Sequence, residues 1–206
     1  AVGMYVDNIP YLDKSAFDFN FYDIERMDLL RGPQAALYGR NAMAGLVKIH
    51  TRSPFNYHGT DLKLGYATKD NHRNISLTHY HQIGEQFAFS AGGYYEGSDG
   101  FFRNNILQEK VDHMQSAGGR LRGIWKVSRN WAIDFNLNYD YSDEGGYPYL
   151  LYDVSPAGEW PGLEKGYVNN RAASYRRNLF NGGLSIEHQA QQFVMTATTG
   201  FQHLSY

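Results

Sequence analysis

The chain has 206 residues, with 19 Lys and Arg against 21 Asp and Glu, and it contains no cysteine. A nearly balanced charge without a dense basic run argues against nucleic-acid binding, because phosphates need clustered cations. The absence of cysteine excludes disulfides, thiolate metal sites and a cysteine nucleophile. High contents of Tyr (17), Phe (12) and Gly (22), with only 6 Pro, favour strands and tight turns.

Residues 1–54 predict a small mixed α+β unit that begins abruptly. Tyr5 and Val6 lead into a turn at Asp7-Asn8, and residues 23–31 alternate charged and apolar side chains before Gly32-Pro33 ends them. Residues 35–39 are typical of one helical turn closed by glycine. Residues 45–51 form a strand pattern that Pro54 ends.

From about residue 57 the pattern changes to alternating strands. In residues 131–142 one face is apolar or aromatic and the other is small or polar, and six further segments repeat this period of two. We therefore predict seven strands. Their aromatic residues near strand ends would form interfacial girdles, and they include Trp131, Phe193, Tyr139, Tyr141, Tyr94 and Tyr95.

The connections between these strands alternate in length. Tight turns are expected near residues 84–85, 128–130 and 189–191, and long polar loops at about 97–114 and 143–176. Membrane barrels have this arrangement, with short periplasmic turns and long extracellular loops. A negative mean hydropathy does not exclude a barrel, since each spanning strand needs only ~9–11 alternating residues. A soluble β-sandwich has the same period of two and stays open as an alternative.

One segment carries a specific motif. Residues 24–54 read IERMDLLRGPQAALYGRNAMAGLVKIHTRSP, and residues 5–10 read YVDNIP. Together they closely resemble the plug signature of TonB-dependent outer-membrane receptors. One departure is Ala44, where the family usually has a second glycine. The intact Arg31-Gly32-Pro33 favours the siderophore and cobalamin branch over the polysaccharide importers.

The resemblance implies an architecture and a mechanism. Residues 1–54 would be the C-terminal part of a plug, and residues 55–206 the first strands of a transmembrane antiparallel β-barrel of ~22 strands. Such a receptor sits in the cell outer membrane, in contact with its lipid. It binds a siderophore or cobalamin-like ligand, and the TonB complex of the inner membrane energises import through a segment outside this chain.

Candidate site residues follow from the same motif. Arg31, with Gly32 and Pro33, is the expected plug–barrel contact, because a charge buried there must be paired. Gly39, Asn41 and Gly45 are expected at plug turns. In the long loop, aromatic and arginine side chains are candidate ligand contacts, as at many recognition surfaces; the alternative is that they only pack the loop against itself or meet lipid head groups. They are Tyr147, Tyr149, Tyr152, Trp160, Arg171, Arg176 and Arg177.

Catalysis and metal binding have little support in the sequence. No Gly-x-Ser-x-Gly elbow is present, and no cofactor or catalytic residue is predicted. His79 and His81 would lie on one face of a strand, but a metal needs further ligands and none is evident. A non-transporting surface binding protein or adhesin remains the alternative to a transporter.

Overall fold

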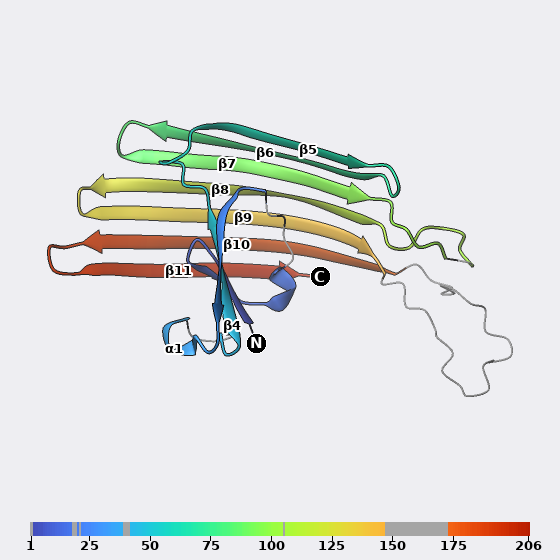
Figure 1. Cartoon of the computed structure of the whole chain (residues 1–206), viewed down its shortest axis with the longest axis horizontal. Helices are drawn as coiled ribbons and strands as arrows, with labels where there is room; N and C mark the ends of the chain where they lie inside the picture. The colour runs from blue at the N-terminus through green and yellow to red at the C-terminus, as the bar shows by residue number, and fades with distance from the viewer. Residues whose placement is uncertain (1, 18–19, 21, 39–41, 105, 147–172) are drawn as a thin grey trace.

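The computed structural model describes residues 2–17, 20, 22–38, 42–104, 106–146 and 173–206. Within these ranges the chain forms two β-sheets of very different size (Figure 1). A small four-stranded sheet lies against a large seven-stranded one. No helix among the described residues is long and apolar enough to cross a membrane.

The small sheet, called the plug sheet here, has the strand order β2-β1-β4-β3. Its strands are β1 (Val2–Val6), β2 (Ile9–Tyr11), β3 (Ile24–Arg31) and β4 (Gly45–Thr51), with a 3-10 helix at Lys14–Ala16 and the single turn α1 at Ala35–Tyr38. Asp7 and Asn8 have φ values of 48° and 67°, as a tight β1–β2 hairpin requires. The turn, the helical turn and the β4 strand expected from the sequence are confirmed.

The large sheet, called the wall here, consists of seven antiparallel strands in chain order. They are β5 (Gly59–Ala67), β6 (His72–Ile83), β7 (Phe87–Ser98), β8 (Met114–Ser128), β9 (Trp131–Gly145), β10 (Ser174–Gln189) and β11 (Val194–Ser205). The predicted number of strands and their antiparallel order are confirmed for the described residues.

Tight and long connections alternate along the wall. Residues 84–86, 129–130 and 190–193 join strands at one end, while residues 68–71, 99–113 and 146–173 join them at the other (Figure 1). The strands continue further than the alternation of their side chains indicates, so β9 ends at Gly145 and β10 begins at Ser174. The predicted loop at 143–176 is therefore shorter at both ends, and Arg176 belongs to a strand.

The two faces of the wall are reversed relative to a soluble protein. On β9 the polar Asn138, Asp140 and Ser142 are buried at 7%, 3% and 2% exposure, while Leu137 and Tyr139 on the other face are 42% and 47% exposed. A soluble sandwich buries its apolar face. An exposed apolar face and a covered polar one are what a membrane barrel needs.

One residue of the expected girdle lies on the wrong face. Tyr94 is 8% exposed, its hydroxyl donates to Asp140 Oδ1 at 2.8 Å, and its ring lies 5.4 Å from that of Tyr22 in the plug. The sequence-based placement of Tyr94 in a lipid-facing girdle is wrong, because Phe87–Ser98 puts its even-numbered residues on the inner face. Tyr95, its neighbour, is 36% exposed on the outer face.

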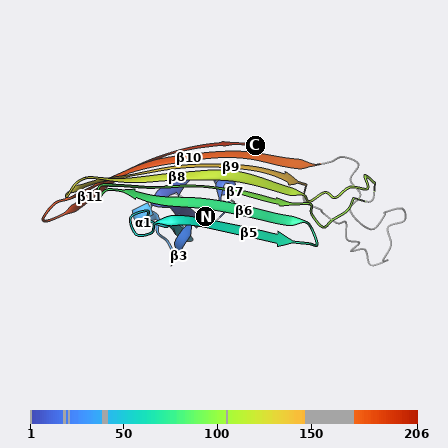
Figure 2. The same ribbon diagram turned by 90° about the horizontal axis from the view of Figure 1, so that it is seen from above.

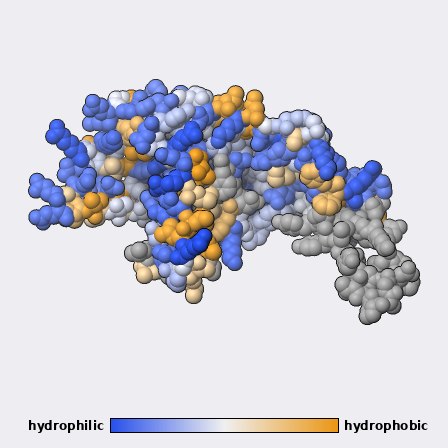
Figure 3. Space-filling view, in the orientation of Figure 1, coloured by the Kyte–Doolittle hydropathy of each residue, from blue (hydrophilic) through white to orange (hydrophobic). Residues whose placement is uncertain are grey.

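The plug sheet packs into the concave side of the wall (Figure 2). The apolar cluster that joins them includes Met4, Val6 and Ile49 of the plug and Leu179 of β10, which is fully buried. A Cβ at Gly183 would collide with the Ile9 side chain, so this glycine makes room for the plug. On either side of the plug the exposed inner face is largely hydrophilic (Figure 3).

Candidate functional site at the plug–wall interface

Arg120 of β8 forms a buried ion pair with Asp23, the residue just before β3. The two side chains are 4% and 3% exposed. The guanidinium also lies over the Tyr22 ring, 5.6 Å from its centroid. Burial raises the pKa of the Asp23 carboxyl, and the charge of Arg120 opposes that rise. Each charge is therefore costly at this interface without the other.

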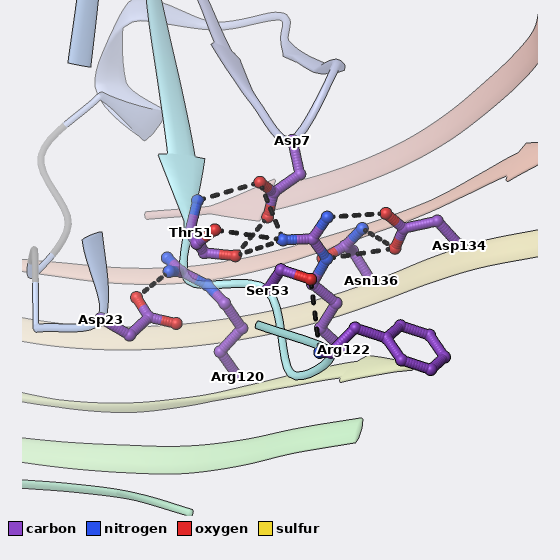
Figure 4. A network of polar contacts seen from close by, with 9 residues as sticks. Asp7, Asp23, Thr51, Ser53, Arg120, Arg122, Asp134 and Asn136 are labelled. Carbon is purple, nitrogen blue, oxygen red and sulfur yellow. Dashed lines mark hydrogen bonds and ion pairs between the residues drawn. The ribbon is translucent and has the colours of Figure 1, made fainter. Parts of the chain in front are cut away.

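Arg122, two residues further along β8, joins three elements (Figure 4). Its Nη1 lies 3.2 Å from Asp7 Oδ1 and donates to Thr51 Oγ1 at 2.8 Å, while Nη2 donates to Asp134 Oδ2 of β9 at 2.7 Å. Thr51 in turn donates to Asp7 from its backbone N–H and its hydroxyl, at 2.9 and 2.7 Å. One arginine of the wall thus binds the C-terminal ends of both central plug strands, β1 and β4.

The alternation of β8 explains why both arginines face inward. Leu121 and Trp125 are 38% and 48% exposed on the outer face, so Arg120 and Arg122 fall on the inner one. Antiparallel pairing sets Arg122 opposite Asn136, next to Asp134. The wall by itself therefore carries a positive charge next to a negative one on its inner face. The plug adds further carboxylates.

Neutral phenols surround these ion pairs on the plug side. Burial raises the pKa of Tyr11 to about 12 and also raises the pKa of Tyr22. Both hydroxyls therefore stay protonated at physiological pH, and the fixed charges at the interface are those of the arginines and carboxylates.

The segment between β4 and β5 is held against the wall. Arg52 Nη1 lies 2.5 Å from Asp61 Oδ2, and the Tyr57 hydroxyl donates to the other oxygen of Asp61 at 2.6 Å. Lys126 Nζ lies 3.8 Å from the centroid of the Phe55 ring. These contacts fix the point where the plug continues into the wall.

Further polar contacts hold the plug segment between β2 and β3. Asn20 Nδ2 donates to Glu96 Oε2 at 2.7 Å, Lys63 Nζ donates to the Tyr22 carbonyl at 2.7 Å, and Arg177 Nη1 donates to the Ser15 carbonyl at 2.6 Å. All three wall partners come from different strands. Separate polar contacts consequently hold this segment of the plug to β5, β7 and β10.

A polar hollow of about 200 Å³ adjoins the Arg122 contacts. Its lining carries both charges and hydroxyls and consists of Asp7, Glu25, Arg26, His50, Thr51, Ser53 and Arg122. The hollow is large enough for several waters, which can solvate these charges when a contact is broken.

The predicted plug residues lie elsewhere in the plug. Arg31 ends β3, is exposed, and makes no ion pair with any residue that the structure describes. Its role as a plug–barrel contact stays a prediction, since only seven wall strands are present. Gly32 has φ +87°, which favours glycine, and a Cβ on Gly45 would lie 2.8 Å from the Leu30 carbonyl oxygen. Pro33 is exposed, and Gly39 and Asn41 lie outside the described residues.

The predicted ligand contacts lie mostly outside the described ranges. This holds for Tyr147, Tyr149, Tyr152, Trp160 and Arg171. Arg176 is described, and it stands on the outer face of β10, where its Nε lies 2.9 Å from Asp143 Oδ2 and its side chain is 69% exposed. Its neighbour Arg177 faces inward instead.

The arginines that contact the plug were not found from the sequence. Arg120 and Arg122 occupy neighbouring inward positions in the alternation of β8, and two arginines at a spacing of two on a wall strand are the signal that could have found them. For metals, no group of three or more potential ligands occurs in the part of the chain that the structure describes.

Comparison with known proteins identifies the N-terminal part of the chain. Residues 1–46 match the family model of the TonB-dependent receptor plug domain. The pesticin receptor of Yersinia pestis is 34% identical over 74 residues, which cover 36% of this chain and 11% of that protein. The vitamin B12 transporter BtuB of Vibrio vulnificus is 29% identical over 150 residues, covering 69% of this chain and 22% of that protein.

Solved structures show the same fold. The ferric yersiniabactin uptake receptor FyuA of Yersinia pestis aligns with a TM-score of 0.78 at 18% identity, covering 98% of this chain and 32% of that one. The ferric-catecholate import receptor Fiu of E. coli aligns with a TM-score of 0.75 at 16% identity, covering 98% and 29%. The chain thus spans about a tenth to a third of the length of these relatives.

A plug sheet held by ion pairs against the polar face of a membrane wall is the arrangement found in plugged outer-membrane barrels. Residues 1–46 match the plug domain of TonB-dependent receptors, and the chain as a whole has the fold of the corresponding part of such receptors. Its relatives are receptors and transporters rather than enzymes.

Proposed function

We propose that the receptor to which this chain belongs binds and imports a scarce nutrient, a ferric-siderophore complex, using energy that TonB delivers from the inner membrane. The observation that carries the proposal is the plug, which covers the polar face of the wall and is held by Asp23–Arg120 and Asp7–Arg122. A covered lumen must open for a solute to pass.

The relatives support an iron complex as the ligand. Two of the structural neighbours are named for ferric yersiniabactin uptake and ferric-catecholate import. The intact Arg31-Gly32-Pro33 agrees with this branch. A cobalamin ligand is the second candidate, because the match to the vitamin B12 transporter covers the larger share of this chain.

The interface suggests how opening proceeds. Ion pairs of low exposure are stable only while both partners remain in place, so displacement of the plug must separate Asp7 and Asp23 from Arg122 and Arg120. The adjacent hollow can supply water to the separated groups. An energy input at the plug would then move it without leaving bare charges.

The test is deletion of the full-length gene, followed by growth on single nutrient sources. We expect loss of growth on at least one ferric siderophore in iron-depleted medium, with growth on cobalamin unchanged, and abolition of iron uptake by a proton uncoupler. Loss of growth on cobalamin alone would show that the ligand is cobalamin and not a ferric siderophore. Unchanged growth on every source would refute transport.

A further inference from the structure

A small polar island interrupts the apolar outer face of the wall. The Thr60 hydroxyl lies 2.8 Å from His79 Nδ1, and the His79 and His81 rings are stacked with centroids 5.8 Å apart and planes at 20°. All three residues are exposed. The surrounding exposed side chains are apolar and include Leu62, Leu77 and Ile83.

The strand alternation establishes that the island faces outward. Thr78 and Tyr80, which alternate with the histidines on β6, are 3% and 1% exposed on the covered face. Register places Thr60 opposite His79. The island therefore faces lipid in the membrane and not the lumen.

Its height matches the level of lipid headgroups. His81 of β6 pairs with Phe89 of β7. The next outward-facing pair along these strands is Ile83 with Phe87, and it adjoins the tight turn at residues 84–86. Exposed aromatic residues mark the same end of the wall, namely Trp125, Trp131 and Phe193. Such aromatic girdles lie at the membrane interface, where phosphates are found.

The island has hydrogen-bonding capacity to spare. His79 uses one ring nitrogen on Thr60, and His81 makes no hydrogen bond with any residue in the described ranges. An imidazole keeps an N–H donor in every tautomer. An ionisable side chain on a lipid-facing surface is costly unless a polar partner meets it.

We propose that Thr60, His79 and His81 bind the phosphate group of a phospholipid in the leaflet next to the tight turns. Phosphodiester oxygens are acceptors only, so they complement the N–H of His81 and the one donor that the Thr60–His79 pair has left, either the hydroxyl or the imidazole N–H. The acyl chains lie along Leu62, Leu77 and the neighbouring apolar residues. The site holds one lipid against β5 and β6, at the edge of the wall where the plug chain enters it.

The experiment uses the full-length receptor in nanodiscs of phosphatidylethanolamine and phosphatidylglycerol. A phospholipid with a photoactivatable headgroup is cross-linked, and the labelled peptides are mapped. We expect labelling within His72–Ile83, and about tenfold weaker lipid retention in the His79→Leu, His81→Leu double variant by native mass spectrometry. Glycerol phosphate in solution should not compete.

The matched control is His203→Leu, which removes an exposed histidine of β11 from the same outer face. It should retain lipid as the unmodified receptor does. Heat-modifiable gel mobility establishes that each variant is folded, and iron uptake measured in parallel tests the transport proposal separately. Equal lipid retention in the folded double variant, or labelling that does not map to β6, would overturn the proposal. Displacement by glycerol phosphate would also overturn it.

Discussion

Arg122 is the residue on which the plug–wall contact concentrates. Its side chain is 11% exposed and lies between Asp7, at 3%, and Asp134, at 24%. Two carboxylates around one guanidinium leave a net negative charge, which the hydrogen bonds from Thr51 to Asp7 and from Asn136 to Asp134 help to stabilise. Removal of the arginine leaves both carboxylates unpaired.

We predict that Arg122→Met destabilises the full-length receptor by about 3–5 kcal/mol, because it leaves low-exposure charges without a partner. The measurement is the free energy of unfolding from denaturant titration. Arg26→Met is the control, since the Arg26–Asp28 pair is 63% and 40% exposed and its loss should cost below about 1 kcal/mol. Equal costs for the two variants would contradict the assigned role of Arg122.

Two carboxylates, Asp70 and Asp99, lie at the end of the wall that carries the long loops, and the pKa of each is lowered. A hydrogen bond from Ser98 lowers the pKa of Asp70, and hydrogen bonds from Asn71 and then Arg73 lower the pKa of Asp99. The Asp99 backbone N–H also donates to the Asp70 carbonyl at 2.8 Å. Both ionised carboxylates thus tie the β5–β6 turn to the end of β7.

Since both pKa values are lowered on folding, the stabilisation is complete above the ordinary value of 3.8 and is lost as pH falls through the lower folded values. We predict that a spin label at Phe101→Cys becomes more mobile as pH falls below about 3.8. Asp99→Asn should weaken this pH dependence. Glu109→Gln, an exposed carboxylate of the same loop, should leave it unchanged.

At the scale of the element, β9 shows how a strand separates two solvents. Register places Leu137 between Leu121 of β8 and Gly182 of β10 on the outer face. Asn136, on the inner face, donates to Asp134 at 3.1 Å. The period of two therefore assigns neighbouring residues to lipid and to the plugged lumen.

We predict that Leu137→Arg lowers the stability of the full-length barrel by about 2–4 kcal/mol, as expected for a charge facing hydrocarbon near the midplane. Asn136→Arg should cost less, because the new charge lies on the polar inner face, with Asp134 beside it as well as Arg122 opposite. Folding titrations into lipid vesicles measure both. A larger cost for Asn136→Arg would show that the faces are reversed.

At the scale of the whole molecule, the alternating connections fix how the wall crosses the membrane. The loop 99–113 is ordered by Asp112, whose carboxylate accepts from the Phe101 and Phe102 backbone N–H groups at 2.8–3.0 Å. Phe101 is 55% exposed at the long-loop end. Arg129 is exposed in a tight turn at the opposite end.

We predict that an impermeant thiol reagent on intact cells labels Phe101→Cys and not Arg129→Cys, in a receptor free of other cysteines. Long loops face outward in outer-membrane barrels and tight turns face the periplasm. Both positions should react once the membrane is permeabilised. The reverse order on intact cells would invert the topology.

The wall also leaves β5 and β11 as the edges of the described sheet. Unpaired backbone groups at a sheet edge are unfavourable in hydrocarbon, so these edges need partner strands in a membrane. The expectation of a barrel of ~22 strands follows the family's architecture. The division at residues 54 and 55 stays an interpretation, and it falls between Thr51 and Gly59, where the plug sheet gives way to the wall.

The sequence by itself determined the features that depend on near neighbours. The turn at Asp7-Asn8, the strand Gly45–Thr51 and the seven alternating strands are local, because dihedral preference and a period of two act over a few residues. The plug motif predicted the family through fixed spacings within one segment. These predictions needed no knowledge of which segments meet.

Only the tertiary structure decided which distant residues meet. Asp23 and Arg120 are 97 positions apart in the sequence. The sequence between Asp7 and Arg122, which are in contact, contains most of the plug and part of the wall. The sequence directed attention to Arg31, a plug arginine, because its motif is local. In the observed ion pairs the carboxylate belongs to the plug and the arginine belongs to the wall. Strand register and the seating of the plug select those pairs, and neither can be read from residues that are close in the chain.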